Sequence, residues 1–219
     1  MTDKLTVDSE EQAVALTSSA PLIYVVDDDE DVVESIAQLL SSHDLSVQSF
    51  TYPEQFLANI SLDRPGCIIL DLMMPELNGL EVLSQLAARG IGIPVILLSG
   101  YGTIAKAVEA MHMGALDFLE KPCPGQILID SVNSALKADG IRREQNRKTD
   151  DSRKRIERLT RREREVFILV AQGKSNRDIG GLLEISTRTV ETHRKRLMKK
   201  MVIRGFDELL SLAKDLQLN

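Results

Sequence analysis

Five short apolar runs alternate with longer amphipathic segments between residues 22 and 136, and no other feature of the chain restricts its fold as much. The runs are LIYVV, LSVQSF, CIIL, IPVILL and ALDFL. Runs of this length between amphipathic helices are typical of a parallel sheet covered on both faces. Five such units predict an α/β fold with a doubly wound five-stranded sheet, because a TIM barrel needs eight. We expect the helices at residues 32 to 40, 53 to 60, 80 to 88, 104 to 113 and 126 to 136.

Charge divides the chain into an acidic and a basic part. Residues 1 to 140 contain 6 lysines and arginines and 21 aspartates and glutamates, whereas residues 141 to 219 contain 21 and 12. The net charge is therefore −15 in the first part and +9 in the second. Cations gathered in one part indicate a surface for nucleic acid or another polyanion, although a basic segment can also be only a solvated face.

The basic part contains helical patterns and needs no strand. After Lys137 comes a charged segment without apolar periodicity, which we interpret as a linker that is partly helical. Thr160 with Glu163, and Ser175 with Asp178, have the spacing of capping boxes, and we assign capping as the only role of the first pair. We predict a mobile extension at residues 1 to 20, a first domain at 21 to 138, a linker at 139 to 157 and an all-α domain of four helices at 158 to 219.

The cysteines and the N-terminal residues indicate in which cellular compartment the protein is expected. Cys67 and Cys123 lack metal-ligand spacing, and the acidic start MTDKLTVDSEE lacks the positive segment of a signal peptide. No run approaches the roughly eighteen consecutive apolar residues of a membrane span. We therefore expect a cytoplasmic protein without a membrane partner, in which Cys67 is a small buried core residue.

Polar residues at the ends of the predicted strands carry the strongest chemical signal. Three aspartates, residues 27 to 29, follow the first run, Asp71 follows the third, Ser99 the fourth and Lys121 the fifth. The carboxyl ends of parallel strands share one edge, where open α/β sheets bind their ligands. Carboxylates and an ammonium should therefore converge there, while Asp29 is expected to cap the following helix.

The predicted carboxylate cluster requires a cation, because clustered carboxylates repel one another. Hard oxygen ligands of this kind suit Mg²⁺, so we expect Asp27, Asp28 and Asp71 to bind it. Asp71 could then attack a phosphoryl group, whose charge the metal, Lys121 and the Ser99 hydroxyl would neutralise.

Four motifs in fixed order resemble the receiver domain of two-component response regulators. They are VVDDDEDV, ILDLMMPELNG, VILLSGYG and DFLEKP, and the resemblance covers about 120 residues. It implies a flavodoxin-like sheet with strand order 2-1-3-4-5, and a cis peptide bond between Lys121 and Pro122. It also implies that Asp71 is the phosphoacceptor for a sensor histidine kinase. The implied ligands of Mg²⁺ are Asp28, Asp71 and the Met73 carbonyl, with Asp27 acting through water.

The same resemblance implies a switch at the fourth strand and its neighbour. Ser99 would move toward the phosphoryl group while Phe118, with Tyr101 nearby, repacks and alters the surface of the fourth and fifth helices of the domain. For Phe118 and Tyr101, ordinary packing is the alternative. Met73 and Tyr101 are poor candidates for positioning an attacking water, so we expect slow loss of the phosphoryl group.

Two enzyme-like classes fit the first domain less well. Phosphatases of the haloacid-dehalogenase type need a second aspartate two positions after the nucleophile, and this chain has Met73 there. A nucleotide-binding Rossmann domain needs a glycine-rich turn after the first strand, where this chain has DDDED. We therefore do not expect an enzyme.

A helix expected at residues 187 to 201 has one apolar and one cationic face. Val190, Leu197 and Met201 form the apolar face. The opposite face suits a major groove, where phosphates attract cations and base edges discriminate between sequences. Gly180 lies where the preceding helix must turn toward this one, and its missing side chain permits a close backbone approach there. Together with Gly181 it lowers helix stability by roughly 1 kcal/mol per glycine relative to alanine.

The segment from Leu159 to about Leu212 resembles the LuxR-type helix-turn-helix through LTRREREV, GKSNRDI and ISTRTVETHRKRLMKK. Glu191 could instead pair with Lys195, and His193 could be a packed or capping residue. The resemblance implies base contacts by Glu191, Thr192 and Lys195, and phosphate contacts by Arg188, Thr189, His193, Arg194 and Lys199.

A receiver joined to this helix-turn-helix resembles the FixJ/NarL group of transcription regulators. The resemblance implies double-stranded promoter DNA and RNA polymerase as partners, and a homodimer on phosphorylation or DNA binding. The alternative is a phosphorylation-independent DNA-binding module whose receiver is only a protein-interaction platform. The intact set of acidic residues with Lys121 argues against that alternative.

Overall fold

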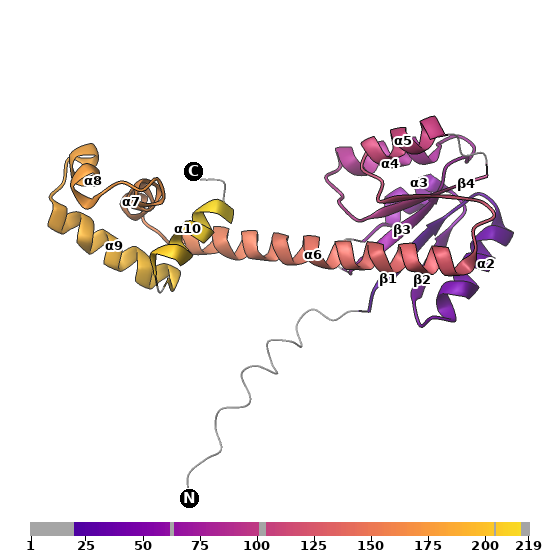
Figure 1. The fold of residues 1–219 in the computed structure, drawn as a ribbon, viewed down its shortest axis with the longest axis horizontal. Helices are drawn as coiled ribbons and strands as arrows, with labels where there is room; N and C mark the ends of the chain where they lie inside the picture. The colour runs from indigo at the N-terminus through magenta and orange to yellow at the C-terminus, as the bar shows by residue number, and fades with distance from the viewer. Residues whose placement is uncertain (1–19, 62–63, 101–103, 204, 216–219) are drawn as a thin grey trace, which may run out of the picture. The chain divides into compact units, whose positions relative to one another are not determined.

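The computed structural model describes residues 20 to 61, 64 to 100, 104 to 203 and 205 to 215 (Figure 1). Tyr101 and nearly all of the predicted mobile extension lie outside these ranges. The chain divides into two compact units, Met1–Arg142 and Arg143–Asn219. In the described part of the chain, no helix combines the length and the apolar character that a membrane span requires.

The first unit is built on a five-stranded parallel sheet. Its strands run in the order β2-β1-β3-β4-β5, which confirms the predicted fold class and strand order. The strands are β1 (Leu22–Val26), β2 (Ser46–Phe50), β3 (Gly66–Asp71), β4 (Val95–Ser99) and β5 (Asp117–Glu120). The helices are α2 (Glu30–Ser41), α3 (Pro53–Asn59), α4 (Gly79–Ala88), α5 (Ile104–His112) and α6 (Gly125–Glu157).

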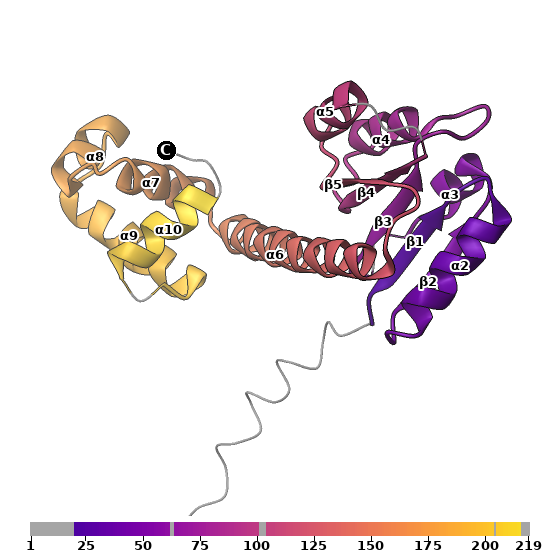
Figure 2. The ribbon, with the colours of Figure 1, turned by 45° about the vertical axis from the view of Figure 1, so that its right-hand side comes forward.

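Helices cover both faces of the sheet, as the apolar strand sequences require (Figure 2). Successive residues of a strand point to opposite faces. Ile23 and Val25 pack with α2 and α6, whereas Tyr24 and Val26 pack with α3 and α4. Both faces of β1 are therefore buried, so a ligand can reach this part of the sheet only at the ends of the strand.

The strand register brings the predicted site residues together at one edge. Val26 pairs with Leu70, so the next residues of these two strands, Asp27 and Asp71, are neighbours. Asp71 in turn pairs with Leu98, the residue before Ser99. The parallel register therefore places the polar end of each strand beside that of the next.

Local capping explains how the chain turns away from this edge. Asp29 accepts hydrogen bonds from the first amides of α2, which confirms its predicted capping role. Gly79 starts α4 directly against β3, and a Cβ at this position would lie 2.4 Å from the Asp71 carbonyl oxygen. Only glycine fits there without moving the backbone that carries Asp71.

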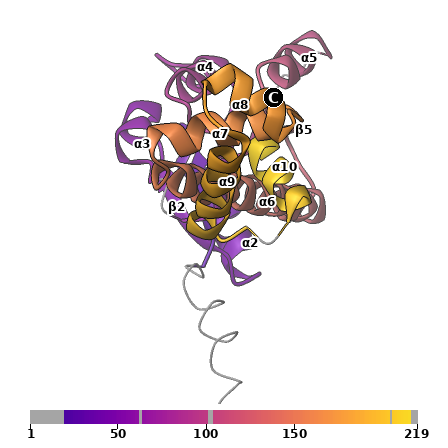
Figure 3. The ribbon, with the colours of Figure 1, turned by 90° about the vertical axis from the view of Figure 1, so that its left-hand side faces the viewer.

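The second unit contains four short helices and the end of α6 (Figure 3). Thr160 and Ser175 start α7 and α8 with the predicted capping boxes, and Ser186 caps α9. The helices are α7 (Arg161–Ala171), α8 (Asn176–Leu183), α9 (Thr187–Met201) and α10 (Phe206–Asp215). The second unit has its own core, which includes Ile156, Val166, Phe167, Val170, Ile179, Val190, Leu197, Met201, Leu209 and Leu212.

Two predictions about the second unit can be compared with its geometry. Val190, Leu197 and Met201 are buried on one face of α9, as their spacing indicates. A Cβ on Gly180 would lie 2.8 Å from the Ile185 carbonyl oxygen, which confirms the close approach between α8 and the turn. Helix α6 continues without interruption through residues 139 to 157, the segment interpreted as a partly helical linker.

Candidate functional site

Three carboxylates meet at the carboxyl edge of the sheet. Asp27, Asp28 and Asp71 can each direct one carboxylate oxygen so that all three atoms lie within 4.8 Å of one another. Asp27 and Asp71 are buried, with 2% and 5% of their surface exposed, while Asp28 is exposed. Hard oxygen donors at this separation, with one side open to solvent, match the ligands that Mg²⁺ prefers.

Lys121 joins two of these carboxylates from the end of β5. Its Nζ lies 2.5 Å from Asp27 Oδ2 and 2.5 Å from Asp71 Oδ1. The Lys121 amide donates to the Ser99 carbonyl, and the Lys121–Pro122 peptide bond is cis, as predicted. The backbone of Lys121 is therefore fixed at the end of β5, and its ammonium group is held by the two carboxylates.

The pKa values of this cluster follow from burial and pairing. Burial raises the pKa of Asp27, and the hydrogen bond and charge of Lys121 only partly offset it. Burial alone would lower the pKa of Lys121, but its bonds to Asp27 and Asp71 outweigh burial and raise it. Lys121 is therefore a fixed positive charge at neutral pH, and the carboxylates still favour a further cation.

The loop after β3 organises the side chain of Asp71. The Met73 amide donates to Asp71 Oδ2 at 2.5 Å, so the two carboxylate oxygens have different partners. Ser99 is fully buried at the end of β4. Phe118 is half-buried and packs against the core under α3 and α4, which is compatible both with a switch and with ordinary packing. The roles proposed for the Met73 carbonyl and for Phe118 remain predictions.

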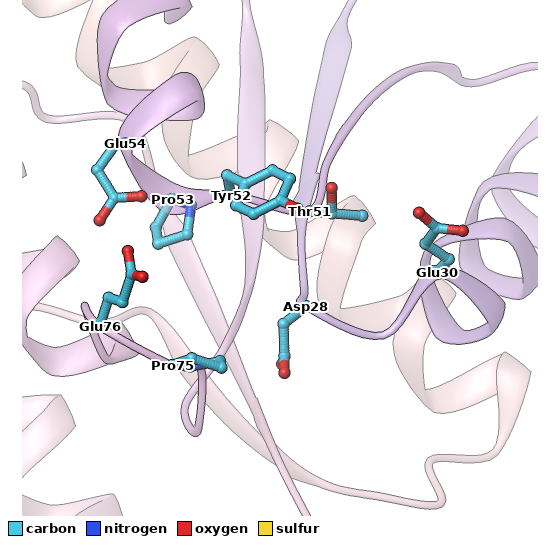
Figure 4. Close-up of a pocket in the computed structure, with 8 residues that line it drawn as sticks. All are labelled: Asp28, Glu30, Thr51, Tyr52, Pro53, Glu54, Pro75 and Glu76. Atoms are coloured by element: carbon cyan, nitrogen blue, oxygen red, sulfur yellow. The ribbon is translucent and has the colours of Figure 1, made fainter.

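A shallow cavity opens beside Asp28 between three loops (Figure 4). Its volume is about 260 Å³, and all four of its charged lining residues are acids. In the view of Figure 4, Glu54 and Glu76 face each other on one side, with Asp28 and Glu30 on the other. The cavity therefore favours the approach of a cation rather than an anion. It is lined by Asp28, Glu30, Thr51, Tyr52, Pro53, Glu54, Pro75 and Glu76.

The polar face of α9 is a candidate DNA interface. Arg188, Glu191, Thr192, Lys195 and Lys199 are exposed, whereas Thr189, His193 and Arg194 are partly buried. Among the described residues no ion pair joins Glu191 to Lys195, so the predicted alternative of an internal pair is not formed here. The two side chains remain available on the surface.

Of the three partly buried residues of α9 that are predicted to contact DNA, two make hydrogen bonds within the protein. Arg194 donates to Asn176 Oδ1 at 2.7 Å and so connects α9 to the start of α8. His193 Nδ1 is buried and finds no hydrogen-bond partner in the part of the chain that the structure describes. Thr189 meets Ser186 in the helix cap. Arg194 and Thr189 therefore help to shape the helix-turn-helix.

Capping is not the only role of Glu163, which corrects the sequence-based assignment. Glu163 does bond to the Thr160 amide, but its Oε2 also lies 2.6 Å from Nζ of Lys200 at the end of α9. The carboxylate is buried, and burial alone would raise its pKa, but its bonds to Lys200 and Thr160 outweigh burial and lower it. The partner is 37 residues away, so local spacing could not reveal it.

A doubly wound sheet with this acidic edge, together with a helix-turn-helix unit, defines the class of two-component response regulators. Comparison with known families agrees with this class. Residues 23–133 match the response regulator receiver domain, and residues 157–213 match the luxR family of bacterial regulatory proteins. The chain belongs to the response regulators that combine these two domains, and it is a phosphorylation-dependent transcription regulator.

Individual relatives align over almost the whole chain. The transcriptional regulatory protein FixJ of Azorhizobium caulinodans is 43% identical over 195 residues, which are 87% of this chain and 90% of FixJ. The response regulator TodT of Pseudomonas putida is 35% identical over 202 residues, 92% of this chain and 89% of TodT. Among solved structures, the response regulator StyR is 35% identical with a TM-score of 0.77, and the alignment covers 90% of this chain and 99% of StyR.

Proposed function

We propose that Asp71 accepts a phosphoryl group from a phosphohistidine of a sensor kinase. A carboxylate oxygen of Asp71 attacks phosphorus, a P–O bond forms, and the P–N bond to histidine breaks as the imidazole leaves with its electron pair. Lys121 supports this step because its ammonium lies 2.5 Å from Asp71 and compensates the charge that Asp71 gains. The buried Ser99 at the next strand end would supply a hydroxyl to the phosphoryl oxygens.

Mg²⁺ is the cofactor that the donor set fits best. We assign Asp28, Asp71 and the Met73 carbonyl as ligands, and Asp27 as a partner through water. When bound, the metal would neutralise charge on the phosphoryl oxygens. The assignment is supported by the carboxylates of Asp27, Asp28 and Asp71, whose oxygens lie within 4.8 Å of one another.

The proposed output is sequence-specific binding of promoter DNA by the second unit. Exposed Glu191, Thr192 and Lys195 would read bases, and the remaining predicted residues would contact or approach phosphates: Arg188, Thr189, His193, Arg194 and Lys199. RNA polymerase as a partner and a homodimer formed on phosphorylation are parts of the same proposal. We assign residues 139 to 157 as the linker between the receiver and the DNA-binding domain.

The observation that carries this function is the pair of 2.5 Å contacts that Lys121 makes with Asp27 and Asp71. A receiver used only as a docking platform has no need of two buried carboxylates paired with one partly buried ammonium, because burying such charges is unfavourable unless the site uses them. The platform alternative predicts equal DNA binding with and without a phosphodonor.

The test is labelling of the full-length protein with a small phosphodonor and Mg²⁺. Asp71→Asn should abolish labelling, because the amide cannot form the acyl phosphate. Asp44→Asn is the matched control: Asp44 is at a turn with positive φ, which asparagine tolerates. Label that persists in Asp71→Asn would refute the acceptor assignment. Selection of genomic DNA fragments with and without phosphodonor then identifies the operator.

A further inference from the structure

A second lysine contacts the loop that carries the phosphoacceptor. Lys106 lies in the first turn of α5, and its Nζ donates to Met73 Sδ at 3.4 Å. Met73 is the residue whose amide holds Asp71 Oδ2 at 2.5 Å. Met73 therefore contacts both the Lys106 ammonium, through its side chain, and the Asp71 carboxylate, through its amide.

The contact between Lys106 Nζ and Met73 Sδ is weaker than the one that a phosphoryl oxygen could make with the same ammonium. A thioether sulfur is a poor hydrogen-bond acceptor, whereas a phosphoryl group offers charged oxygens that form short charge-assisted bonds with ammonium groups. The Met73 side chain is half exposed, so Lys106 can leave it without disturbing the core. A lysine stem also has enough rotatable bonds to follow a nearby anion.

The charge distribution of the first unit strengthens this attraction. Residues 1 to 140 contain only 6 lysines and arginines against 21 acids, and Lys121 is already held between two carboxylates. Phosphorylation of Asp71 would add negative charge to an edge with an excess of it. Any cation within reach of that edge gains more from pairing with the new group than it would on a neutral surface.

We propose that Lys106 is a positioning residue for the phosphoryl group on Asp71. Its ammonium exchanges Met73 Sδ for a phosphoryl oxygen, and the exchange draws the first turn of α5 toward the β3–α4 loop. This inference rests on Asp71 being the phosphoacceptor. It gives phosphorylation a direct electrostatic connection to α5, a helix whose first residue, Ile104, is 86% exposed.

The test uses beryllofluoride, a tetrahedral anion that bonds to a carboxylate oxygen as a phosphoryl group does. Bound anion is measured by fluorine NMR on the full chain with Mg²⁺. Lys106→Met should weaken binding about threefold to tenfold, the range expected for one charge-assisted contact. Lys106→Arg keeps the charge and should restore most of the affinity. Lys137→Met removes an exposed charge from α6 and should leave it unchanged.

A second readout follows α5 itself. Beryllofluoride should slow amide hydrogen exchange in residues 104 to 112 of the wild type and of Lys106→Arg, and much less in Lys106→Met. If Lys106→Met binds and protects like the wild type, or if Lys106→Arg loses as much as Lys106→Met, the role of Lys106 is refuted while Asp71 stands. If Asp71→Asn binds beryllofluoride as well as the wild type, the phosphoacceptor assignment itself fails.

Discussion

Three buried carboxylates, those of Asp27, Asp71 and Glu163, are paired with lysines from distant parts of the chain. Lys121 meets Asp27 and Asp71 in the first unit, and Glu163 meets Lys200 in the second. Lys121, Asp27 and Asp71 lie at the open carboxyl edge of the sheet, where a bound ligand can change their contacts. The ion pair of the second unit joins the buried Glu163 of α7 to the partly exposed Lys200 of α9, so it helps to hold α9, the helix that carries the predicted DNA contacts.

Replacing Glu163 by glutamine should destabilise the second unit. Glutamine can still accept from the Thr160 amide, but it loses the charge that pairs with Lys200. We expect a loss of about 1 to 2 kcal/mol in the free energy of unfolding at pH 7. Urea unfolding of the full chain, followed by NMR signals from α7 and α9, measures it.

The stability lost in Glu163→Gln should become smaller as the pH falls. The folded state lowers the pKa of Glu163 from its ordinary value of 4.5, so its carboxylate stabilises the fold fully above that value. This contribution disappears as pH falls through the lower pKa of the folded state. Wild type and Glu163→Gln should therefore converge in stability once the pH lies below the lowered pKa of the folded state. A difference that stayed constant with pH would show that packing, not charge, is lost.

At the level of residues, the sequence predicts what depends on local spacing or on strand ends. Asp29 as a cap, the meeting of Asp27, Asp28 and Asp71, and the position of Lys121 all follow from the pattern of β and α segments. Lys106 with Met73 and Arg194 with Asn176 could not be predicted in this way. Their partners are 33 and 18 residues away, and the pairing depends on how side chains cross between elements.

Helix α8 is the element whose sequence is least suited to its structure. It has eight residues, and two of them, Gly180 and Gly181, are consecutive glycines. The two differ in their surroundings, because a Cβ on Gly180 would meet the Ile185 carbonyl oxygen at 2.8 Å, whereas one on Gly181 would meet nothing within 4 Å. The first glycine is required by packing, and the second only weakens the helix.

Alanine at these two positions should have opposite effects. Gly181→Ala should stabilise the second unit by about 0.5 to 1 kcal/mol, since it lowers the entropy lost on forming the helix. Gly180→Ala should destabilise it by about 1 to 3 kcal/mol, because backbone must move to admit the methyl group. Urea unfolding of both variants measures the difference. Equal effects of the two substitutions would contradict the close approach at Gly180.

Helix α6 extends well beyond the end that its sequence pattern predicts. Its first part packs on the sheet through apolar residues, but the charged part offers no apolar periodicity from which a boundary could be read. The structure adds a polar anchor: the buried carboxylate of Asp139 accepts from the Gly66 amide at 3.1 Å and from Arg142 at 2.6 Å. Gly66 starts β3, the strand that ends at Asp71, so α6 is attached to the strand of the proposed phosphoacceptor.

At the scale of the whole molecule, two opposite charges are kept in separate units. Each unit has its own core. Acidic side chains predominate in the first unit and basic side chains in the second, and the two kinds of charge suit different ligands. The acidic sheet edge would attract the proposed metal ion, while the basic unit attracts the DNA backbone. Phosphorylation adds charge only to the acidic unit, so it leaves the number of cations facing DNA unchanged.

This separation makes the salt dependence of DNA binding a test of how phosphorylation acts. The logarithm of the binding constant falls with the logarithm of salt concentration by about 0.9 for each phosphate neutralised. If phosphorylation brings two chains onto one operator, as we propose, the slope for the complex should become about twice that of the unphosphorylated chain on a half-site. If it only frees the DNA-binding unit, affinity should rise with the slope unchanged. Gel-shift titrations of the full chain from 50 to about 200 mM salt, with and without beryllofluoride, distinguish the two, because only a second set of cations on the DNA can steepen the slope.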